Sequence, residues 1–313
     1  MTLAKVAEMA GVAPNTARRA LKNEPSVRPH IRERVIKAAK KLDYHPNLVA
    51  RGLRDSDLKL VPFATNSHNV HYFGMLSEHI GRELVDIGME PLLCHGVDHL
   101  LRVCRSFRAR GCVLASLETP DRVRDLARGH RLVTVNALNP ELSVANVAID
   151  LNGTYRRLVR RFIAEGRKKI AVASLSYVTA VEKGWPTQKF PAVLDTLKKA
   201  GLPPAGGAVF PTPRAFGEWL ERTRGREVDA VLCDDDLMAA CVVGEMARLG
   251  MRTPEDVLVV GCDANLLVPG IWSVFLDTSA IAGMAVDLLR KALETDGAVE
   301  SVVYKPGVVE YTP

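Results

Sequence analysis

The sequence predicts a small all-α domain at the N-terminus followed by a larger α/β body with parallel sheets. Three observations support this division. Two short helical patterns joined by a tight turn open the chain, and the excess positive charge lies within the first 57 residues. Over the remaining 256 residues, strand-like and helix-like segments alternate, which is typical of parallel sheets covered by helices.

The charge distribution separates the two parts. Residues 1–57 contain twelve Lys or Arg and six Asp or Glu, so they carry the whole net charge of +6 and the rest of the chain is neutral. A basic end on a neutral body indicates an anionic polymer as partner. Charge by itself leaves a solvated basic surface without function as the alternative.

The first two predicted helices flank a glycine turn. Thr2 can cap a helix over residues 3–10, and Gly11 ends it because a positive φ costs glycine little. Pro14 stands where a second helix begins, at a position that has no need of a backbone N–H. That helix directs Ala17, Ala20 and Leu21 inward. After a loop rich in Pro and Ser, a third helix is expected over residues 30–42.

The second helix concentrates hydrogen-bonding side chains at and after its N-terminus. Asn15, Thr16, Arg18, Arg19 and Lys22 lie there, facing outward. A helix fits the major groove of DNA, where Arg can pair with guanine and Asn with adenine, while nearby basic residues neutralise phosphates. The alternative is a three-helix bundle that binds nothing, but such a bundle has no need of this polar cluster.

The pattern of residues 58–313 predicts two doubly wound lobes. Helices are expected over residues 73–88, 153–166, 190–201 and 237–250, and strands over residues 58–65, 89–96, 112–117, 132–138, 169–175, 230–236 and 256–263. Ligands of such folds bind at the carboxyl ends of the strands and between lobes.

Several function classes receive no support from the sequence. There is no stretch long and apolar enough to span a membrane, and the N-terminus lacks the pattern of a secretory signal, so we expect a cytoplasmic protein. The six cysteines form no C-x-x-C pair, which argues against zinc and disulfides, and we expect no metal and no cofactor. Neither a phosphate-binding P-loop nor a G-x-S-x-G nucleophile motif is present.

Two clusters leave a metal site open as a minor alternative. The acids of residues 234–236 follow a predicted strand and could bind Mg²⁺, although the Lys and Ser or Thr partners of such sites cannot be placed. His68, His71, Cys94, His95 and His99 could also bind a metal, but their spacing is irregular. For residues 68–71, polar residues of a cleft or a solvated loop are the competing interpretations.

Residues 2–54 resemble the DNA-binding head and hinge of the lactose/galactose repressor family. The motifs "VAEMAGV", "IRERV", "LDYHPN" and "ARGL" carry the resemblance without a gap. It implies a head over residues 1–46 and a hinge over 47–57, which folds into a short helix on DNA and inserts Leu53 into the minor groove. The DNA-binding residues expected from pattern and resemblance are Thr2, Pro14, Asn15, Thr16, Arg18, Arg19, Asn23, His30, Tyr44, Asn47, Ala50, Arg51 and Leu53.

Some positions depart from the family pattern. Ala13 and Arg18 replace serines at the recognition helix, and Arg28 and Ile31 replace a Ser and a Thr near the third helix. Gly52 lies within the hinge helix, where it costs about 1 kcal/mol relative to Ala. These changes indicate an altered operator and a looser hinge, with DNA binding retained.

Residues 58–313 resemble the family's effector domain, which has the two-lobed periplasmic-binding-protein-like fold. The segments "VAIDLNG", "AEGRKKIAVAS", "CDDDLMAACVVGEMARLGMRTPEDVLVVGCD" and "IAGMAVDLLRKAL" carry this resemblance. The effector-binding residues it implies are His71, Tyr72, Phe73, Lys189, Phe210, Asp236 and Asp263. Pro186 stands at the position of a sugar-binding Arg, and the nearby Lys183 and Lys189 could replace it, which suggests an acidic effector.

We therefore expect a ligand-responsive transcriptional repressor. It would bind a pseudo-palindromic operator on double-stranded DNA as a homodimer, since no leucine heptads follow residue 290. A small polar effector, a sugar or sugar acid, would occupy the cleft and act by differential affinity for two conformations. The alternative is a sugar- or phosphate-processing α/β enzyme fused to a DNA-binding head. A transport binding protein is disfavoured by the basic head and the missing signal.

Overall fold

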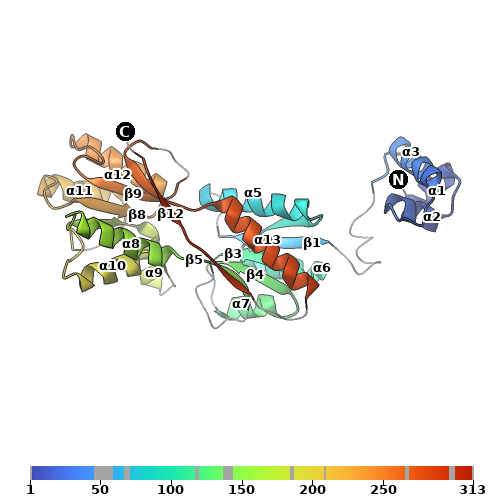
Figure 1. The fold of residues 1–313 in the computed structure, drawn as a ribbon, viewed down its shortest axis with the longest axis horizontal. Coiled ribbons are helices and arrows are strands. Elements are labelled where there is room, and N and C mark those ends of the chain that lie inside the picture. The colour runs from blue at the N-terminus through green and yellow to red at the C-terminus, as the bar shows by residue number, and fades with distance from the viewer. Residues whose placement is uncertain are drawn as a thin grey trace. The chain divides into compact units, whose positions relative to one another are not determined.

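The computed structural model describes most of the chain as two compact units. The described residues are 2–45, 59–66, 71–116, 120–136, 144–183, 187–207, 209–264, 268–295 and 300–311. One unit comprises Met1–Lys59 and the other Leu60–Pro313 (Figure 1). We call them the head and the body.

The head is a three-helix unit with a core of small side chains. Its helices are α1 (Leu3–Ala10), α2 (Pro14–Leu21) and α3 (Pro29–Lys41). The buried residues are mostly alanine and valine, including Ala7, Ala17 and Ala38, with Val35 fully buried. Small side chains let three short helices approach closely, so their burial holds together helices that would be marginal alone.

The turn between α1 and α2 forms as expected from the sequence. The Thr2 hydroxyl accepts a hydrogen bond from the Lys5 N–H at 3.4 Å, and Gly11 has φ 60°. The guanidinium of Arg34, on α3, donates to the carbonyl of Ala10 and so ties the end of α1 to the third helix. This turn sets the position of α2, the predicted recognition helix.

The first lobe of the body is a six-stranded parallel sheet covered on both faces. Strand order is β11-β5-β4-β3-β1-β2. The strands are β1 (Leu60–Thr65), β2 (Glu90–His95), β3 (Gly111–Ala115), β4 (Arg131–Val135), β5 (Ala145–Ile149) and β11 (Ser301–Tyr304). Helices α5 (His71–Asp86) and α13 (Thr278–Glu294) pack together against this sheet, and α6 (Gly96–Phe107) and α7 (Pro120–Ala127) pack against its β1, β2 and β4 strands (Figure 1).

The second lobe repeats this design. Its sheet has the order β12-β10-β9-β8-β6-β7, parallel except for the pairing of β10 with β12. The strands are β6 (Ile170–Ala173), β7 (Val209–Phe210), β8 (Ala230–Cys233), β9 (Leu258–Asp263), β10 (Ile271–Phe275) and β12 (Gly307–Glu310). The helices are α8 (Leu151–Ala164), α9 (Leu175–Lys183), α10 (Phe190–Lys199), α11 (Pro213–Thr223) and α12 (Asp236–Arg248).

The chain passes between the two lobes three times. It crosses from β5 to α8, from β10 to α13, and from β11 to β12, the last of which forms a long ribbon through the middle of the body (Figure 1). One hydrophobic cluster includes residues of both lobes, among them Phe63 and Val113 of the first and Val172 and Val260 of the second. The lobes are therefore linked by covalent crossings and by shared apolar contacts.

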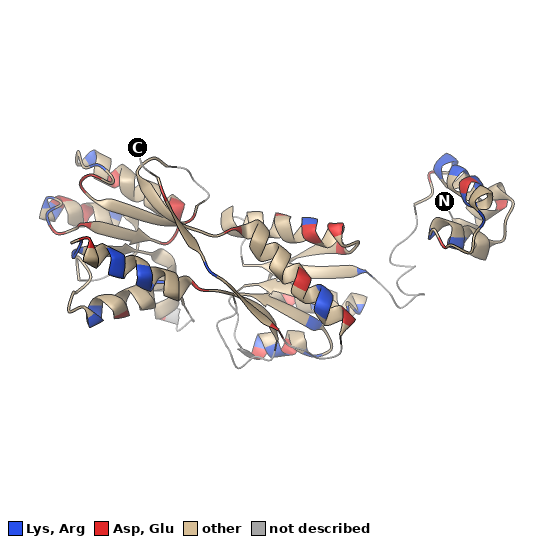
Figure 2. Ribbon diagram, in the orientation of Figure 1, with Lys and Arg blue, Asp and Glu red and all other residues tan. Residues whose placement is uncertain are grey.

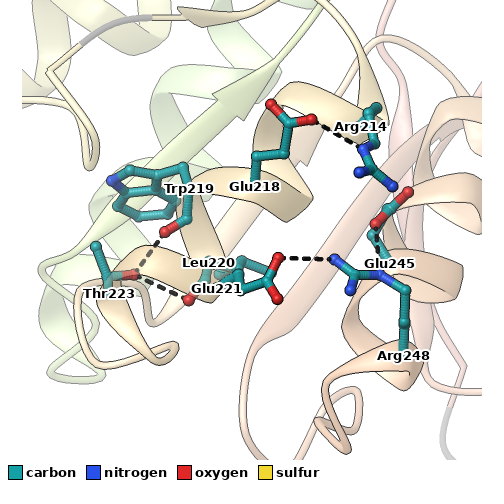
Figure 3. A network of polar contacts seen from close by, with 8 residues as sticks. All are labelled: Arg214, Glu218, Trp219, Leu220, Glu221, Thr223, Glu245 and Arg248. Carbon is teal, nitrogen blue, oxygen red and sulfur yellow. Dashed lines mark hydrogen bonds and ion pairs between the residues drawn. The ribbon is translucent and has the colours of Figure 1, made fainter.

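One ion pair joins the outer helices α11 and α12 of the second lobe, and two others lie within single helices (Figure 3). Arg248 contacts Glu221 across the two helices at 3.4 Å and Glu245 on its own helix at 3.3 Å. Arg214 pairs with Glu218 one helical turn away at 2.9 Å. All of these side chains except Glu245 are exposed, so each pair is worth only about 0–1 kcal/mol. The apolar contacts of Phe216 and Leu220 beneath them hold the helix in place.

The expected elements of the body are present, with small shifts at their ends. The strand expected over residues 58–65 is described from Leu60, and the helix expected from residue 73 begins at His71. In the head, the third helix begins at Pro29, one residue earlier than expected, because proline is well suited to a first helical position. The expected hinge, residues 47–57, lies outside the described residues.

We predict that the Gly261→Ala substitution destabilises the second lobe. A Cβ at Gly261, in β9, would lie 2.2 Å from Oδ1 and 3.0 Å from the Cα of Asp236, so the start of α12 would have to move. The free energy of unfolding should fall by about 1–3 kcal/mol, measured by urea denaturation with circular dichroism. Gly81→Ala, on α5 with open space around its Cβ, should instead be neutral or raise stability by up to about 1 kcal/mol. Equal effects of the two substitutions would contradict the packing argument.

Candidate functional site

The head presents its polar side chains along α2. Asn15 is exposed and Thr16 and Arg18 are partly exposed, while Ala17 and Ala20 of the same helix are buried. The Arg18 guanidinium donates to the Asn15 side-chain oxygen at 2.6 Å, one turn away. Basic residues recur along the helices of the head (Figure 2). The helix thus carries donors and acceptors that can meet base edges and phosphates.

Arg19 differs from its neighbours because it already has partners within the head. Its Nε donates to Glu24 at 2.8 Å, and its Nη2 donates to the Ser26 hydroxyl. Arg32, which the sequence interpretation did not single out, also supports this loop by donating to the carbonyls of Glu24 at 2.8 Å and Val27 at 3.3 Å. Arg19 must exchange its Glu24 contact for DNA if it is to read a base.

The other predicted DNA-binding residues have varied surroundings. Thr2 caps α1, Pro14 begins α2, and Asn23 has a left-handed backbone with φ 58° just after α2. His30 is exposed at the start of α3, and Tyr44 packs partly against the head core. Four further candidates lie outside the described residues, namely Asn47, Ala50, Arg51 and Leu53.

A cavity of about 330 Å³ lies between the lobes of the body. Its walls come from the carboxyl ends of strands in both sheets and from the first turns of the helices that follow, as is usual for parallel sheets. Eight apolar side chains, besides Tyr72, surround a set of polar groups. The polar lining residues are Asn66, Ser116, Asn136, Ser176, Thr187, Gln188, Lys189, Asp234, Asp235 and Asp263.

The segment before α10 holds the cavity's lysine in a strained backbone. Lys189 has φ 65° and ψ −76°, and the Phe190 N–H donates to the Gln188 carbonyl at 2.9 Å across it. Such a γ-turn with positive φ costs a non-glycine residue about 1–3 kcal/mol. The Lys189 N–H donates to the Asn152 side chain at 3.0 Å, and Gln188 donates to Asn136 of the first lobe at 3.1 Å. These contacts connect the segment to both lobes.

The ammonium group of Lys189 lies among acids. Its Nζ donates to the carbonyl of Asp234 at 2.6 Å. Burial by itself lowers the pKa of Lys189, but the charges of Asp263, Asp234 and Asp235 outweigh burial and hold this pKa above its usual range. Lys189 is therefore a cation whose charge is already balanced by its surroundings.

Asp263 is the acid of the cavity whose titration is most perturbed. Burial raises its pKa to about 6, with a further contribution from the charges of Asp235 and Asp236, while Lys189 and the Cys262 thiol act in the opposite direction. Its backbone is left-handed, with φ 94°. The hydroxyl of Tyr72 lies close enough for the Asp263 charge to add to the effect of burial, and both raise the tyrosine pKa.

The three consecutive acids 234–236 have separate structural roles. Asp234 accepts from the hydroxyls of Ser174 at 2.5 Å and Ser176 at 2.7 Å, and Asp235 caps α12 by accepting from the Met238 N–H at 2.7 Å. Asp236 is the first residue of α12, is 3% exposed, and accepts from Ser273 at 2.5 Å. The three carboxylates point to different partners and do not form a magnesium site.

Four predicted effector-binding residues line the cavity and three do not. Tyr72, Phe73, Lys189 and Asp263 are in its walls. Asp236 is turned beneath β9 and β10, and Phe210, on the edge strand β7, packs against Phe216 and Trp219 with ring centroids 5.3 and 5.1 Å away. His71 is exposed at the start of α5. These three residues do not line the cavity, so the structure does not bring them together with the other four.

Asp236 acts on the cavity through another residue. The Ser273 hydroxyl that donates to Asp236 accepts from the Ala264 N–H at 2.9 Å, directly after Asp263. Asp236 thus positions the end of β9. The sequence interpretation also missed Asn66, Ser116, Asn136, Gln188 and the cavity role of Asp234. Asn66, Ser116 and Asn136 each follow a strand directly, and that placement was the signal that could have found them.

Within the part of the chain that the structure describes, no three His, Cys, Asp or Glu side chains are arranged to hold a metal ion. The described helices include none that is both long and apolar enough to cross a membrane.

Two protein-family models match the chain, one for each unit. Residues 2–47 match the model described as bacterial regulatory proteins, lacI family, and residues 159–310 match the periplasmic binding protein-like domain. The helix-turn-helix head and the two-lobed body thus occur in the order and combination that the motifs of the sequence indicate. The chain belongs to the lacI family of bacterial regulatory proteins.

Similar proteins align with most of this chain, including both the head and the body. The HTH-type transcriptional repressor PurR of Mannheimia succiniciproducens is 22% identical, with 98% of this chain and 97% of that protein covered. The HTH-type transcriptional regulator CelR of Thermobifida fusca is 29% identical, with 84% and 82% covered. These relatives are transcriptional regulators, and the present chain is likewise a transcriptional regulator with a DNA-binding head and an effector-binding body.

Solved structures share the fold over the full chain. A lac repressor dimer bound to operator and the anti-inducer ONPF has a TM-score of 0.82 at 19% identity, covering 99% of this chain and 98% of that one. A complex of the transcriptional regulator CelR with cellobiose has a TM-score of 0.67 at 25% identity and covers all of both chains. The lac-repressor-like fold is therefore established for head and body.

We predict that Asp263→Asn stabilises the body at neutral pH. The native pKa of about 6 exceeds the ordinary value of 3.8, so folding favours the protonated acid. The contribution of Asp263 to stability is therefore largest below about pH 4 and is lost as pH rises through 6, by roughly 3 kcal/mol in all. The Asn variant should lack this fall and exceed wild type at pH 8, measured by urea denaturation between pH 4 and 8. Asp287→Asn, in an exposed pair with Arg290, should keep the wild-type profile, and a profile unchanged by Asp263→Asn would contradict the assignment.

Proposed function

We propose that this regulator is a cytoplasmic repressor that binds a pseudo-palindromic operator as a homodimer and responds to a small polar effector in the cavity of the body. The observation that carries the proposal is the likeness to PurR repressors over both head and body, with 98% of this chain covered. The cavity at the strand ends supplies the place where an effector can act.

The head supports DNA reading through α2. Asn15, Thr16 and Arg18 offer exposed or partly exposed polar groups on one short helix, and these groups match the hydrogen-bonding patterns of the major groove. Arg19 would join them after release from Glu24, so Glu24 competes with the DNA for this guanidinium. By resemblance, Leu53 would enter the minor groove and bend the duplex.

The effector would act by changing the relation of the two lobes. Gln188 and Asn136 are hydrogen-bonded across the cavity, and the strained Lys189 turn is held by Asn152 at the first crossing. A ligand that binds one arrangement of these contacts more tightly shifts the population toward it, and the three chain crossings carry the change through the body. DNA affinity then differs between the two populations.

An exposed apolar face on α12 supports the dimer. Leu237 is 65% exposed, Cys241 is exposed one turn later, and a Cβ at Gly244 would meet open space. A helix face of this kind allows the same helix of a second copy to approach closely about a two-fold axis. The lac repressor structure with this fold is that of a dimer.

Selection of duplexes from a random pool by the purified protein tests the proposed function. We expect one pseudo-palindromic sequence to be enriched, with a central step that tolerates bending and with binding that weakens steeply as salt rises. Selection is repeated after Arg18→Ala combined with Asn15→Ala, which should remove the enrichment and leave weak non-specific binding. Enrichment of a site without two-fold symmetry would contradict the dimeric operator.

We predict that Arg19→Ala weakens binding to the selected operator by about 1–3 kcal/mol, if the guanidinium pairs with guanine. Glu24→Gln, which frees Arg19 from its ion pair, should leave binding unchanged or tighten it. Fluorescence anisotropy at fixed salt measures both variants. Unchanged operator affinity for Arg19→Ala would assign this residue to holding the loop through Glu24 and Ser26 instead of reading DNA.

We predict that Leu237→Glu converts the dimer to a monomer. A carboxylate on each copy would be buried against its symmetry mate, at a cost that such an interface cannot offset. Analytical ultracentrifugation should give the mass of one chain, and operator affinity should fall because half-sites are then bound singly. Val303→Glu, at an apolar residue of β11 that is also well exposed, should remain dimeric. Dimers of Leu237→Glu would place the interface elsewhere.

A further inference from the structure

The cavity between the lobes carries more negative than positive charge. Among the described residues that line it, Lys189 is the basic side chain, and Asp234, Asp235 and Asp263 are the acids. Lys189 donates to the Asp234 carbonyl at 2.6 Å, so one of its three N–H donors is in use and its charge is balanced by the acids around it. The remaining imbalance is formally two negative charges.

The protein supplies hydrogen-bond donors from hydroxyl and N–H groups to two of these acids but not to the third. Asp234 is held by Ser174 and Ser176, and Asp235 accepts from the first turn of α12, where the helix dipole favours an anion. For Asp263, no described N–H or hydroxyl donates to the carboxyl group, which has the Cys262 thiol and the Lys189 charge as neighbours. Asp263 is therefore the acid that a ligand donor can best satisfy.

Two further buried polar atoms in the cavity walls have no hydrogen-bond partner among the described residues. They are the hydroxyl of Tyr72, a residue that is 8% exposed, and the side-chain carbonyl of Gln188, whose amide donates to Asn136. Buried polar groups are normally paired, so an unpaired carbonyl oxygen in a cavity that Asp263 also lines indicates a ligand with hydrogen-bond donors. The unfilled positions are thus mainly acceptors.

We propose that the effector of this regulator carries a protonated amine, with Asp263 and the Gln188 carbonyl accepting from its N–H groups. The proposal rests on the proposed function only in taking this cavity as the effector site. The rest of the ligand lies against the apolar walls, which include Phe73, Leu76 and Phe190. A carboxylate here would bring a third uncompensated negative charge into a half-apolar space, which is costly. Lys189 does not offset that cost, because Asp263, Asp234 and Asp235 already balance its charge.

Two sets of probe molecules, each with a cationic, a neutral and an anionic member, test the sign of the ligand's charge. The first set is glucosamine, glucose and glucuronate, and the second is benzylamine, benzyl alcohol and benzoate. We expect at least one amine to raise the thermal unfolding midpoint of the full chain, and to do so more than its neutral and acidic counterparts. An acid or neutral probe that raises the midpoint as much as its amine would overturn the proposal, as would no effect of either amine.

Substitutions that change charge in opposite directions separate recognition from damage to the fold. Asp263→Asn should weaken binding of the active amine about tenfold or more, because a charge-assisted hydrogen bond is lost. Gln188→Glu has nearly the same shape and should strengthen it, an effect that local unfolding cannot produce. Asp125→Asn, on the surface helix α7, should leave the affinity unchanged. Calorimetry measures each, and equal affinities for all three variants would overturn the proposal.

The same experiments distinguish this inference from the proposed function. An amine that binds without altering operator affinity would leave the charge assignment standing and contradict effector control by this cavity. A sugar acid that releases the operator would support the proposed repressor function. It would contradict the inference that the effector carries a protonated amine.

Discussion

The parallel strands of both lobes end at one shared cavity, and most features of the body follow from this constraint. Parallel sheets expose their functional side chains at the carboxyl edge, and here β1, β3, β4, β8 and β9 all contribute residues at or just beyond their ends. Three crossings and a hydrophobic cluster common to both lobes keep the two edges together. Residues that are distant in sequence, such as Tyr72, Gln188 and Asp263, are neighbours for this reason.

Charge in the cavity is controlled by how each carboxylate is solvated by the protein. Hydroxyls and backbone N–H groups replace water around Asp234 and Asp235, and Asp236 is held by Ser273. Asp263 accepts no hydrogen bond from a hydroxyl or N–H group of the described residues, and burial raises its pKa to about 6. Asp236 nevertheless contributes, because its partner Ser273 binds the backbone immediately after Asp263. A buried acid can therefore shape a ligand site without facing it.

The head is a small folding unit, so it has few residues with which to form a core. Its core is built mainly from alanine and valine, so close helix contact replaces large side chains. Arg34 and Arg32 add hydrogen bonds to backbone carbonyls at the ends of helices and in the loop between α2 and α3. The Arg19–Glu24 pair lies in the same region, so one guanidinium serves loop structure in the free protein and is available to DNA only by exchange.

By itself, the sequence determined the order of the elements, the helix-turn-helix, the family and the polar character of α2, because these depend on local spacing, caps and turns. Gly11 and Pro14, for example, mark their turn by backbone preference alone. Tertiary structure decided which members of a polar run face the cavity. Asp235 and Asp236 are adjacent, yet one lines the cavity and the other lies beneath the sheet, because successive residues at a helix start point in different directions. The edge position of Phe210 and the balanced charge of Lys189 likewise depend on contacts between segments far apart in the chain, which no local pattern encodes.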